Sequence, residues 1–164
     1  MTRARAAAGS IVFLLLAPGV TTGLVPWLIT GWEANDWPLP LRVLGALLIA
    51  GGAAVLLHAF ARFVIEGVGT PAPVAPPEHL VVGGLYRHVR NPMYVAVATT
   101  IIGQALLLGR PVLLAYAALF MATVAAFVHL YEEPTLSHRF GDQYEAYRRA
   151  VPAWRPRLHP WRPG

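Results

Sequence analysis

Polar side chains gather at two places in an otherwise apolar chain. The stretch 84–94, GLYRHVRNPMY, puts Arg87 and Arg90 beside a proline, directly before a long apolar run. The second place is the acidic pair Glu132 and Glu133, at the end of the last long apolar run. A carboxylate so close to a membrane interior is costly unless it has a partner. We therefore expect the acidic pair to face either an arginine of 84–94 or a cationic ligand.

The composition of the chain is that of a membrane protein. Of its 164 residues, 56% are hydrophobic and 13% are charged, whereas soluble domains carry about 25% charged residues. The net charge of +5 comes from arginines that flank apolar runs and form no single basic stripe, which favours a membrane over a nucleic acid as partner. Cysteine is absent, so there are neither disulfides nor thiolate ligands, and we predict no metal site.

Four apolar runs divide the chain. They cover residues 9–29, 41–65, 93–108 and 112–131. A membrane-spanning helix needs about 20 apolar residues. Three of the runs reach that length, and the run 93–108 is marginal. We therefore predict an all-α, polytopic membrane protein with about four transmembrane helices and a C-terminal amphipathic helix.

The arginines predict how these helices cross the membrane. They precede the first run and recur in the loop after the second, and six of the thirteen follow Tyr131; cytosolic segments carry such an excess. Both termini and the middle loop should therefore face the cytosol. The single domain then has two spanning helices in 1–65, a cytosolic loop in 66–92, two spanning helices in 93–131 and a cytosolic tail in 132–164. The lysine-free composition resembles a bacterial coding bias, which suggests a bacterial plasma membrane.

The tail carries an apolar stripe at helical spacing. Its members, with Gly141 as an interruption, are Leu136, Phe140, Tyr144, Tyr147 and Val151. The simplest interpretation is an amphipathic helix that lies on the bilayer surface. Pro134 is expected to end or kink the fourth spanning helix. The proline-rich stretch 71–77 predicts a stiff, extended path in the middle loop.

The loop and the tail together resemble the isoprenylcysteine carboxyl methyltransferase family and its phospholipid methyltransferase relatives. The first part of the signature reads Leu80-Val81, Gly84-Leu85-Tyr86 and Arg90-Asn91-Pro92-Met93-Tyr94. The second part reads Glu132-Glu133-Pro134-Thr135-Leu136, Phe140-Gly141, Tyr144, Tyr147 and Val151-Pro152. The likeness covers the second half of the chain, and the first two helices match only in being apolar.

This resemblance implies an enzyme that transfers methyl groups from S-adenosylmethionine to a lipophilic acceptor at the cytosolic membrane face. The implied cofactor ligands are His79, Leu80, Val81, Tyr86, Asn91, Pro92, Tyr94 and Glu132. Glu133 would support Glu132, and either His129 or a glutamate would serve as a base for an amine acceptor. A pocket for this cofactor needs an anionic group, a cationic group and an apolar slot, and neither half of the signature supplies all three by itself. We therefore expect 79–94 to pack against 132–147.

Two positions depart from the family pattern and leave the acceptor open. The histidine that precedes the proline is Asn91 here, which keeps hydrogen bonding but does not titrate. The arginine that prenylcysteine enzymes carry one turn before the first glutamate is Val128 here. The acceptor is therefore either an isoprenylcysteine-like carboxylate or a lipid amine, with a small thiol or phenol as further choices. A small membrane protein without catalysis, whose tail binds lipid or a partner subunit, is the alternative.

Overall fold

The structure, a computed structural model, describes residues 3–67 and 78–162, and the proline-rich stretch 71–77 lies outside them. Every regular element of the described residues is helical, which confirms the predicted all-α class. The elements are α1 (Arg3–Leu16), the π-helical turn η1 (Val20–Leu24), α2 (Val25–Thr30), α3 (Leu39–Arg62), the π-helical turn η2 (Phe63–Gly67), the 3₁₀ turn η3 (Gly84–Arg87), α4 (Pro92–Leu108), α5 (Val112–Phe127), the π-helical turn η4 (Val128–Glu132), α6 (Glu133–Phe140) and α7 (Asp142–Ala150).

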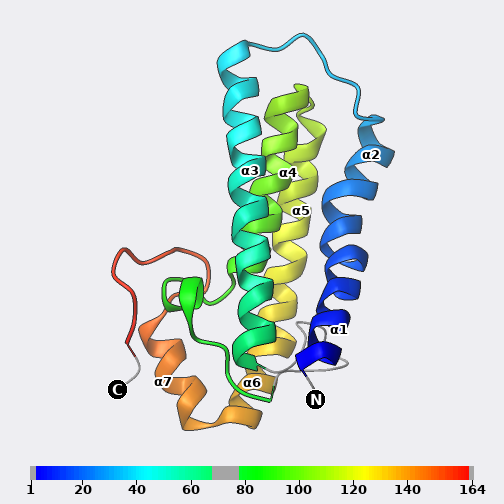
Figure 1. Cartoon of the computed structure of the whole chain (residues 1–164). Helices are drawn as coiled ribbons and strands as arrows, with labels where there is room; N and C mark the ends of the chain where they lie inside the picture. The colour runs from blue at the N-terminus through cyan, green and yellow to red at the C-terminus, as the bar shows by residue number, and fades with distance from the viewer. Residues whose placement is uncertain (1–2, 68–77, 163–164) are drawn as a thin grey trace.

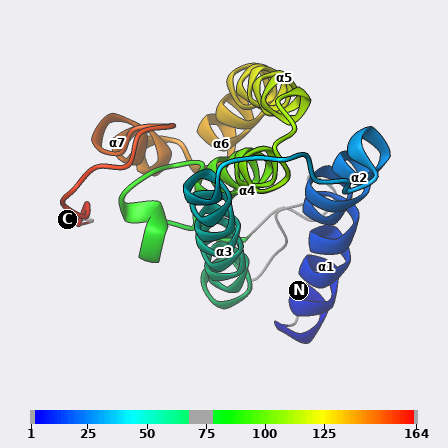
Figure 2. The ribbon, with the colours of Figure 1, turned by 90° about the horizontal axis from the view of Figure 1, so that it is seen from above.

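Three helical stretches are long and apolar enough to cross a membrane. They are Ala8–Thr30, Leu39–Glu66 and Val112–Phe140. The fourth, α4, has 17 residues and is therefore about 26 Å long, slightly less than the hydrocarbon thickness of a bilayer. Figures 1 and 2 show α4 between α3 and α5, shielded by its neighbours. These spans confirm the predicted polytopic membrane fold. The apolar run 93–108, which is of marginal length for a spanning helix, forms the central helix α4.

Glycines bring α3 and α4 into close backbone contact. A Cβ atom added at Gly45 would lie 2.5 Å from the carbonyl oxygen of Gly103, and one added at Gly52 would collide with the Thr100 hydroxyl. Small residues of this kind let membrane helices approach closely where no hydrophobic effect drives them together. The contact fixes the position of α4, and with it the stretch 91–94 at its first turn.

The first span is interrupted by a π-helical turn that its neighbours hold in place. Pro26 lacks an N–H group, so it cannot donate to the carbonyls of the preceding turn. The side chain of Gln104 donates instead to the Thr22 carbonyl at 2.6 Å, and the hydroxyl of Tyr116 donates to the Thr21 carbonyl at 2.8 Å. These bonds tie the first span to α4 and α5 at the depth of the bulge.

The tail differs from the amphipathic surface helix that the sequence predicts. Gly141, at φ 51° and ψ −129°, separates α6 from α7. The second half of the stripe is buried: Tyr144, Tyr147 and Val151 pack in one cluster with Val81 and Tyr86. This half of the stripe therefore covers the middle loop of the protein and not a lipid surface. Pro134 does not end the fourth span, which runs through η4 into α6.

The loop 78–91, α6, α7 and the described ends of the chain lie at one end of the bundle (Figure 1). The loop 31–38 and the turn at Gly109 lie at the other end, where Asn35 donates to the Gly109 carbonyl at 3.0 Å. This arrangement brings together the described parts of the segments for which the arginines predict a cytosolic location. The side of the membrane that they face stays a prediction.

Candidate active site

The polar stretch 84–94 first of all binds the C-terminal segment of the chain. The Nε of Arg87 donates to the Trp161 carbonyl at 2.6 Å, and the Trp161 amide donates to the Arg87 carbonyl at 2.9 Å. At the next residue of the loop, the Arg157 amide donates to the His88 carbonyl at 2.9 Å. The His88 Nδ1 lies 2.8 Å from the Arg157 carbonyl oxygen. The tail backbone is thus fastened to the loop at the C-terminal end of η3.

Arg90 joins this loop to α6 and α7. Its Nη1 donates to the Glu133 Oε1 at 2.6 Å and to the Tyr144 hydroxyl oxygen at 3.0 Å, and its Nε donates to the Val151 carbonyl at 2.9 Å. Both side chains of the ion pair are largely buried, with 11% of each exposed. Removal of one partner from a buried pair costs about 3–5 kcal/mol. Glu133 is therefore the acidic residue that an arginine of 84–94 neutralises.

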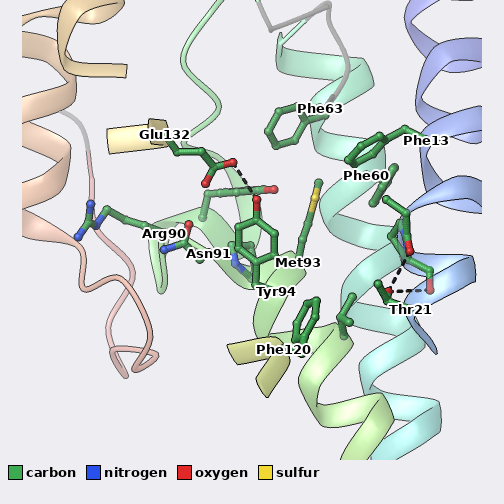
Figure 3. A pocket seen from close by; sticks show the side chains of 15 residues that line it. Phe13, Thr21, Phe60, Phe63, Arg90, Asn91, Met93, Tyr94, Phe120 and Glu132 are labelled. Atoms are coloured by element: carbon green, nitrogen blue, oxygen red, sulfur yellow. Dashed lines mark hydrogen bonds between the residues drawn. The ribbon is translucent and has the colours of Figure 1, made fainter. Parts of the chain in front are cut away.

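Glu132, the other member of the acidic pair, has a different environment. Its Oε1 accepts a hydrogen bond of 2.9 Å from the Tyr94 hydroxyl, as Figure 3 shows. Among the described residues, no basic side chain forms an ion pair with it. Consecutive helical residues point about 100° apart, so the two carboxylates face different surroundings. Glu132 borders a cavity, and Glu133 does not.

This central cavity, of about 140 Å³, lies among α1, α3, α4 and α5. Its polar side is formed by Arg90, Asn91, Tyr94 and Glu132, and the rest of the wall is formed by Phe13, Ala17, Pro18, Thr21, Phe60, Phe63, Tyr86, Pro92, Met93, Val97 and Phe120. In Figure 3 the Met93 side chain lies between the Tyr94 ring and the phenylalanines. The cavity therefore has one carboxylate, that of Glu132, in a wall that is otherwise largely apolar and aromatic.

A smaller loop cavity of about 80 Å³ adjoins the central one. The two cavities share Phe63, Tyr86, Arg90 and Asn91 as wall, and the loop cavity is otherwise lined by Leu80, Val81, Val128, Leu136, Tyr144 and Tyr147. The Tyr147 hydroxyl donates to the Tyr86 carbonyl at 2.7 Å. Burial raises the pKa of both Tyr86 and Tyr147, so these phenols stay protonated at neutral pH and cannot serve as bases.

The contacts of Arg90 and Tyr147 confirm that 79–94 packs against 132–147. Seven of the eight expected cofactor ligands line the two cavities. Leu80 and Val81 border the loop cavity, Tyr86 and Asn91 border both, and Pro92, Tyr94 and Glu132 border the central cavity. His79 is exposed and lines neither cavity.

The two residues expected to act in catalysis lie beside the cavities, not in their walls. The His129 side chain is 77% exposed, and its Nδ1 lies 3.8 Å from the Glu133 Oε2. Glu133 itself is engaged by Arg90. Sequence reasoning also missed the contribution of the first span, which supplies Phe13 and Thr21 to the central cavity. The sequence feature that could have predicted this contribution is the set of aromatic residues near the arginine-rich ends of the first two apolar runs.

The fold and the site define an integral membrane protein with a carboxylate-bearing, mostly apolar cavity between its helices. The chain belongs to the phospholipid methyltransferase family, whose model matches residues 41–143. That match includes α3 to α6, with Tyr94 and Glu132, and stops short of α1 and most of α7. No curated protein and no solved structure matches the chain. The family indicates a membrane methyltransferase that acts on lipid-like acceptors.

Proposed function

We propose that this protein transfers a methyl group from S-adenosylmethionine to the amine of a lipid headgroup at the cytosolic membrane face. The observation that carries the proposal is Glu132: its carboxylate borders an apolar cavity, and Tyr94 is its hydrogen-bond partner there. A carboxylate in such a place is stabilised by a cationic ligand. Both the proposed cofactor and a lipid amine carry positive charge.

The residues present fit the cofactor. The apolar loop cavity, with the tyrosine rings of its wall, suits an adenine ring. The first turn of α4, where Met93 and Tyr94 border the central cavity, has backbone N–H groups that favour a carboxylate. Glu132 would face the ammonium or sulfonium charge. When bound, S-adenosylmethionine supplies a methyl group on a sulfonium, and its sulfur departs as a neutral thioether when the acceptor takes the methyl.

The charges around the cavities favour an amine over a carboxylate as acceptor. Val128, at the position where the resemblance would put a carboxylate-binding arginine, is 3% exposed and borders the loop cavity. Arg90, the basic residue in the described walls, already donates to Glu133, Tyr144 and the Val151 carbonyl. An acceptor carboxylate would find no unpaired cation there and would be repelled by Glu132, whereas an ammonium would be attracted.

An amine must lose a proton before it attacks the methyl carbon. Among the proposed acid–base residues, Glu132 borders the cavity. We therefore assign two roles to it: it binds the ammonium group of the acceptor lipid, and it is the first group to accept the proton that this ammonium loses. His129 and Glu133 remain our candidates for passing that proton to solvent, since His129 is exposed and lies within 3.8 Å of Glu133. The chain otherwise supplies orientation and exclusion of water.

Identification of the methylated product tests the proposal. Purified protein in bilayer discs that contain phosphatidylethanolamine would be incubated with methyl-labelled S-adenosylmethionine, with a prenylcysteine as competing acceptor. We expect label on the lipid nitrogen, lost in Glu132→Gln and kept in Glu33→Gln, a matched change in the exposed loop at the opposite end. Label released by mild base as volatile methanol would identify a carboxyl methyl ester and overturn the amine assignment. No labelled product with any acceptor would favour a protein without catalysis.

A further inference from the structure

An apolar groove of about 400 Å³ lies between α1 and α3, outside the site described above. Seven apolar side chains and Ser10 line it. Ile11 and Leu57 on its two walls are largely exposed. Both walls belong to the spans Ala8–Thr30 and Leu39–Glu66, so the groove opens toward the hydrocarbon of the bilayer.

The groove exists because the first span is held against its neighbours at the π-helical turn η1, while α1, which precedes η1, stands away from α3. The bonds from Gln104 and Tyr116 fix η1 against α4 and α5. Figure 2 shows α1 set apart from α3, on the far side of the bundle from α7. Between these two helices the groove leaves room for a chain-like apolar group.

One aromatic pair separates the groove from the central cavity. Phe60 borders both hollows. Phe13, which borders the cavity, stacks on Phe60 with ring centroids 6.2 Å apart. Figure 3 shows the two rings side by side, across the cavity from Tyr94. The Phe60 side chain therefore stands between a molecule in the groove and the cavity that Glu132 borders.

A buried hydroxyl in the groove wall points to a polar group on the occupant. Ser10 is 3% exposed, and its Oγ has no hydrogen-bond partner in the described part of the chain. A hydroxyl left unpaired in apolar surroundings is costly. Ser10 stands near the beginning of the first span, and the interfacial region of a bilayer, where the ester groups of a glycerolipid lie, is at the ends of spanning helices.

We propose that the groove binds one acyl chain of the lipid acceptor, with its ester carbonyl accepting a hydrogen bond from Ser10. The headgroup of the same lipid reaches Glu132 past Phe13 and Phe60. This inference rests on the proposed function for the identity of the lipid. The groove makes the lipid approach sideways from the bilayer, between α1 and α3.

Cross-linking locates the lipid without any methyl transfer. Wild-type protein in bilayer discs would be irradiated with phosphatidylethanolamine that carries a diazirine on one acyl chain, in the absence of cofactor, and the labelled peptides mapped by mass spectrometry. We expect labelling around Leu57 (58% exposed) several times stronger than around Leu47 on the same helix, which is 65% exposed. Equal labelling at both positions would mean that bulk lipid covers the groove, and would overturn the inference.

Filling the groove tests its role in catalysis. Ala61→Trp, in the groove wall, should raise the lipid concentration at half-maximal methyl transfer severalfold and leave the value for S-adenosylmethionine unchanged. Ala54→Trp, on an exposed part of α3, is the control and should change neither. An Ala61→Trp variant that is folded and kinetically unaltered would contradict the proposal. If the wild-type protein methylates no lipid, the proposed function fails, and the cross-linking still decides whether a lipid occupies the groove.

A comparison of ester-linked with ether-linked lipids distinguishes the proposed hydrogen bond of Ser10 from the mere fit of the acyl chain in the groove. An ether oxygen is a poorer acceptor than an ester carbonyl, so wild-type protein should prefer ester-linked phosphatidylethanolamine by about two- to tenfold, the range of one hydrogen bond. Ser10→Ala should abolish this preference without changing thermal stability. A preference that persists in Ser10→Ala would overturn the role of Ser10.

Discussion

At the scale of single residues, two adjacent glutamates have different surroundings. Glu133 is neutralised by Arg90 and buried with it, whereas Glu132 meets the Tyr94 hydroxyl at the edge of a cavity. The sequence predicts that the pair needs partners, because carboxylates are costly at this depth. It does not reveal which member pairs with the arginine. That depends on the π-helical turn η4, which ends at Glu132 and sets the direction of each side chain.

Glu133→Gln should destabilise the folded protein. The change leaves the buried Arg90 guanidinium without its carboxylate, which costs about 3–5 kcal/mol. We expect a lower melting temperature without any ligand, measured by intrinsic fluorescence in detergent. Glu145→Gln is the control, because Glu145 lies on the nearby α7 and is more exposed. Equal melting temperatures for wild type and Glu133→Gln would contradict the structural role of the ion pair.

Tyr147 should make stability fall at alkaline pH. Burial raises its pKa in the folded state, so folding favours the protonated phenol. That contribution is complete below the ordinary tyrosine pKa of about 10 and is lost as the pH rises toward the folded-state value. In denaturation curves between pH 8 and pH 11, Tyr147→Phe should lose less stability above about pH 10 than wild type. Parallel curves for the two proteins would refute this.

At the scale of helices, glycine contacts position the site. Gly45 of α3 and Gly103 of α4 allow the two backbones to touch, and α4 carries Tyr94 at its first turn. The sequence predicts each helix from its apolar length. The choice of neighbours was not predictable, since the runs are apolar all round and give no preferred face.

Gly45→Leu should therefore push α4 away and impair both stability and methyl transfer. A side chain at Gly45 would meet backbone atoms of α4 that cannot move aside. Gly51→Leu is a matched control on the same helix, because a side chain there meets no atom within 4 Å. We expect aggregation or a lower melting temperature for the first variant only, seen by size-exclusion chromatography and thermal unfolding. Similar behaviour of both variants would contradict the close contact.

The elements that the sequence misjudged share one physical cause. For the stripe with Tyr144 and Tyr147, the apolar pattern alone suggests a lipid surface, yet the stripe packs against the middle loop, as the paired motifs predict. The first span is predicted from its sequence only as a spanning helix, yet Phe13 and Thr21 border the central cavity. An apolar stripe shows that a face must avoid water but does not say whether lipid or protein covers it. The paired motifs in the loop and tail, by contrast, predicted seven of the cavity residues because they require specific side chains.

At the scale of the whole molecule, the groups that we propose to act in methyl transfer lie at one end of the bundle, together with both described ends of the chain (Figure 1). The arginine distribution predicts that this end faces the cytosol. The absence of cysteine makes the test simple. Single cysteines would replace Glu33, which is exposed in the loop 31–38, and His159, which is exposed in the tail segment that binds Arg87 and His88. Intact cells would then be treated with an impermeant thiol reagent. Labelling at Glu33→Cys only is expected, and labelling at His159→Cys only would reverse the orientation.

We propose that the Glu132 carboxylate, which no arginine neutralises, makes the cavity a binding site for a cationic cofactor. Isothermal titration calorimetry of S-adenosylmethionine against detergent-solubilised wild type and Glu132→Gln measures this contribution. Since one charge-assisted hydrogen bond contributes about 1.5–3 kcal/mol, we expect affinity to fall about ten- to hundredfold in Glu132→Gln, with its unliganded melting temperature unchanged. Equal affinities for the two proteins, or no binding to wild type, would contradict the claim.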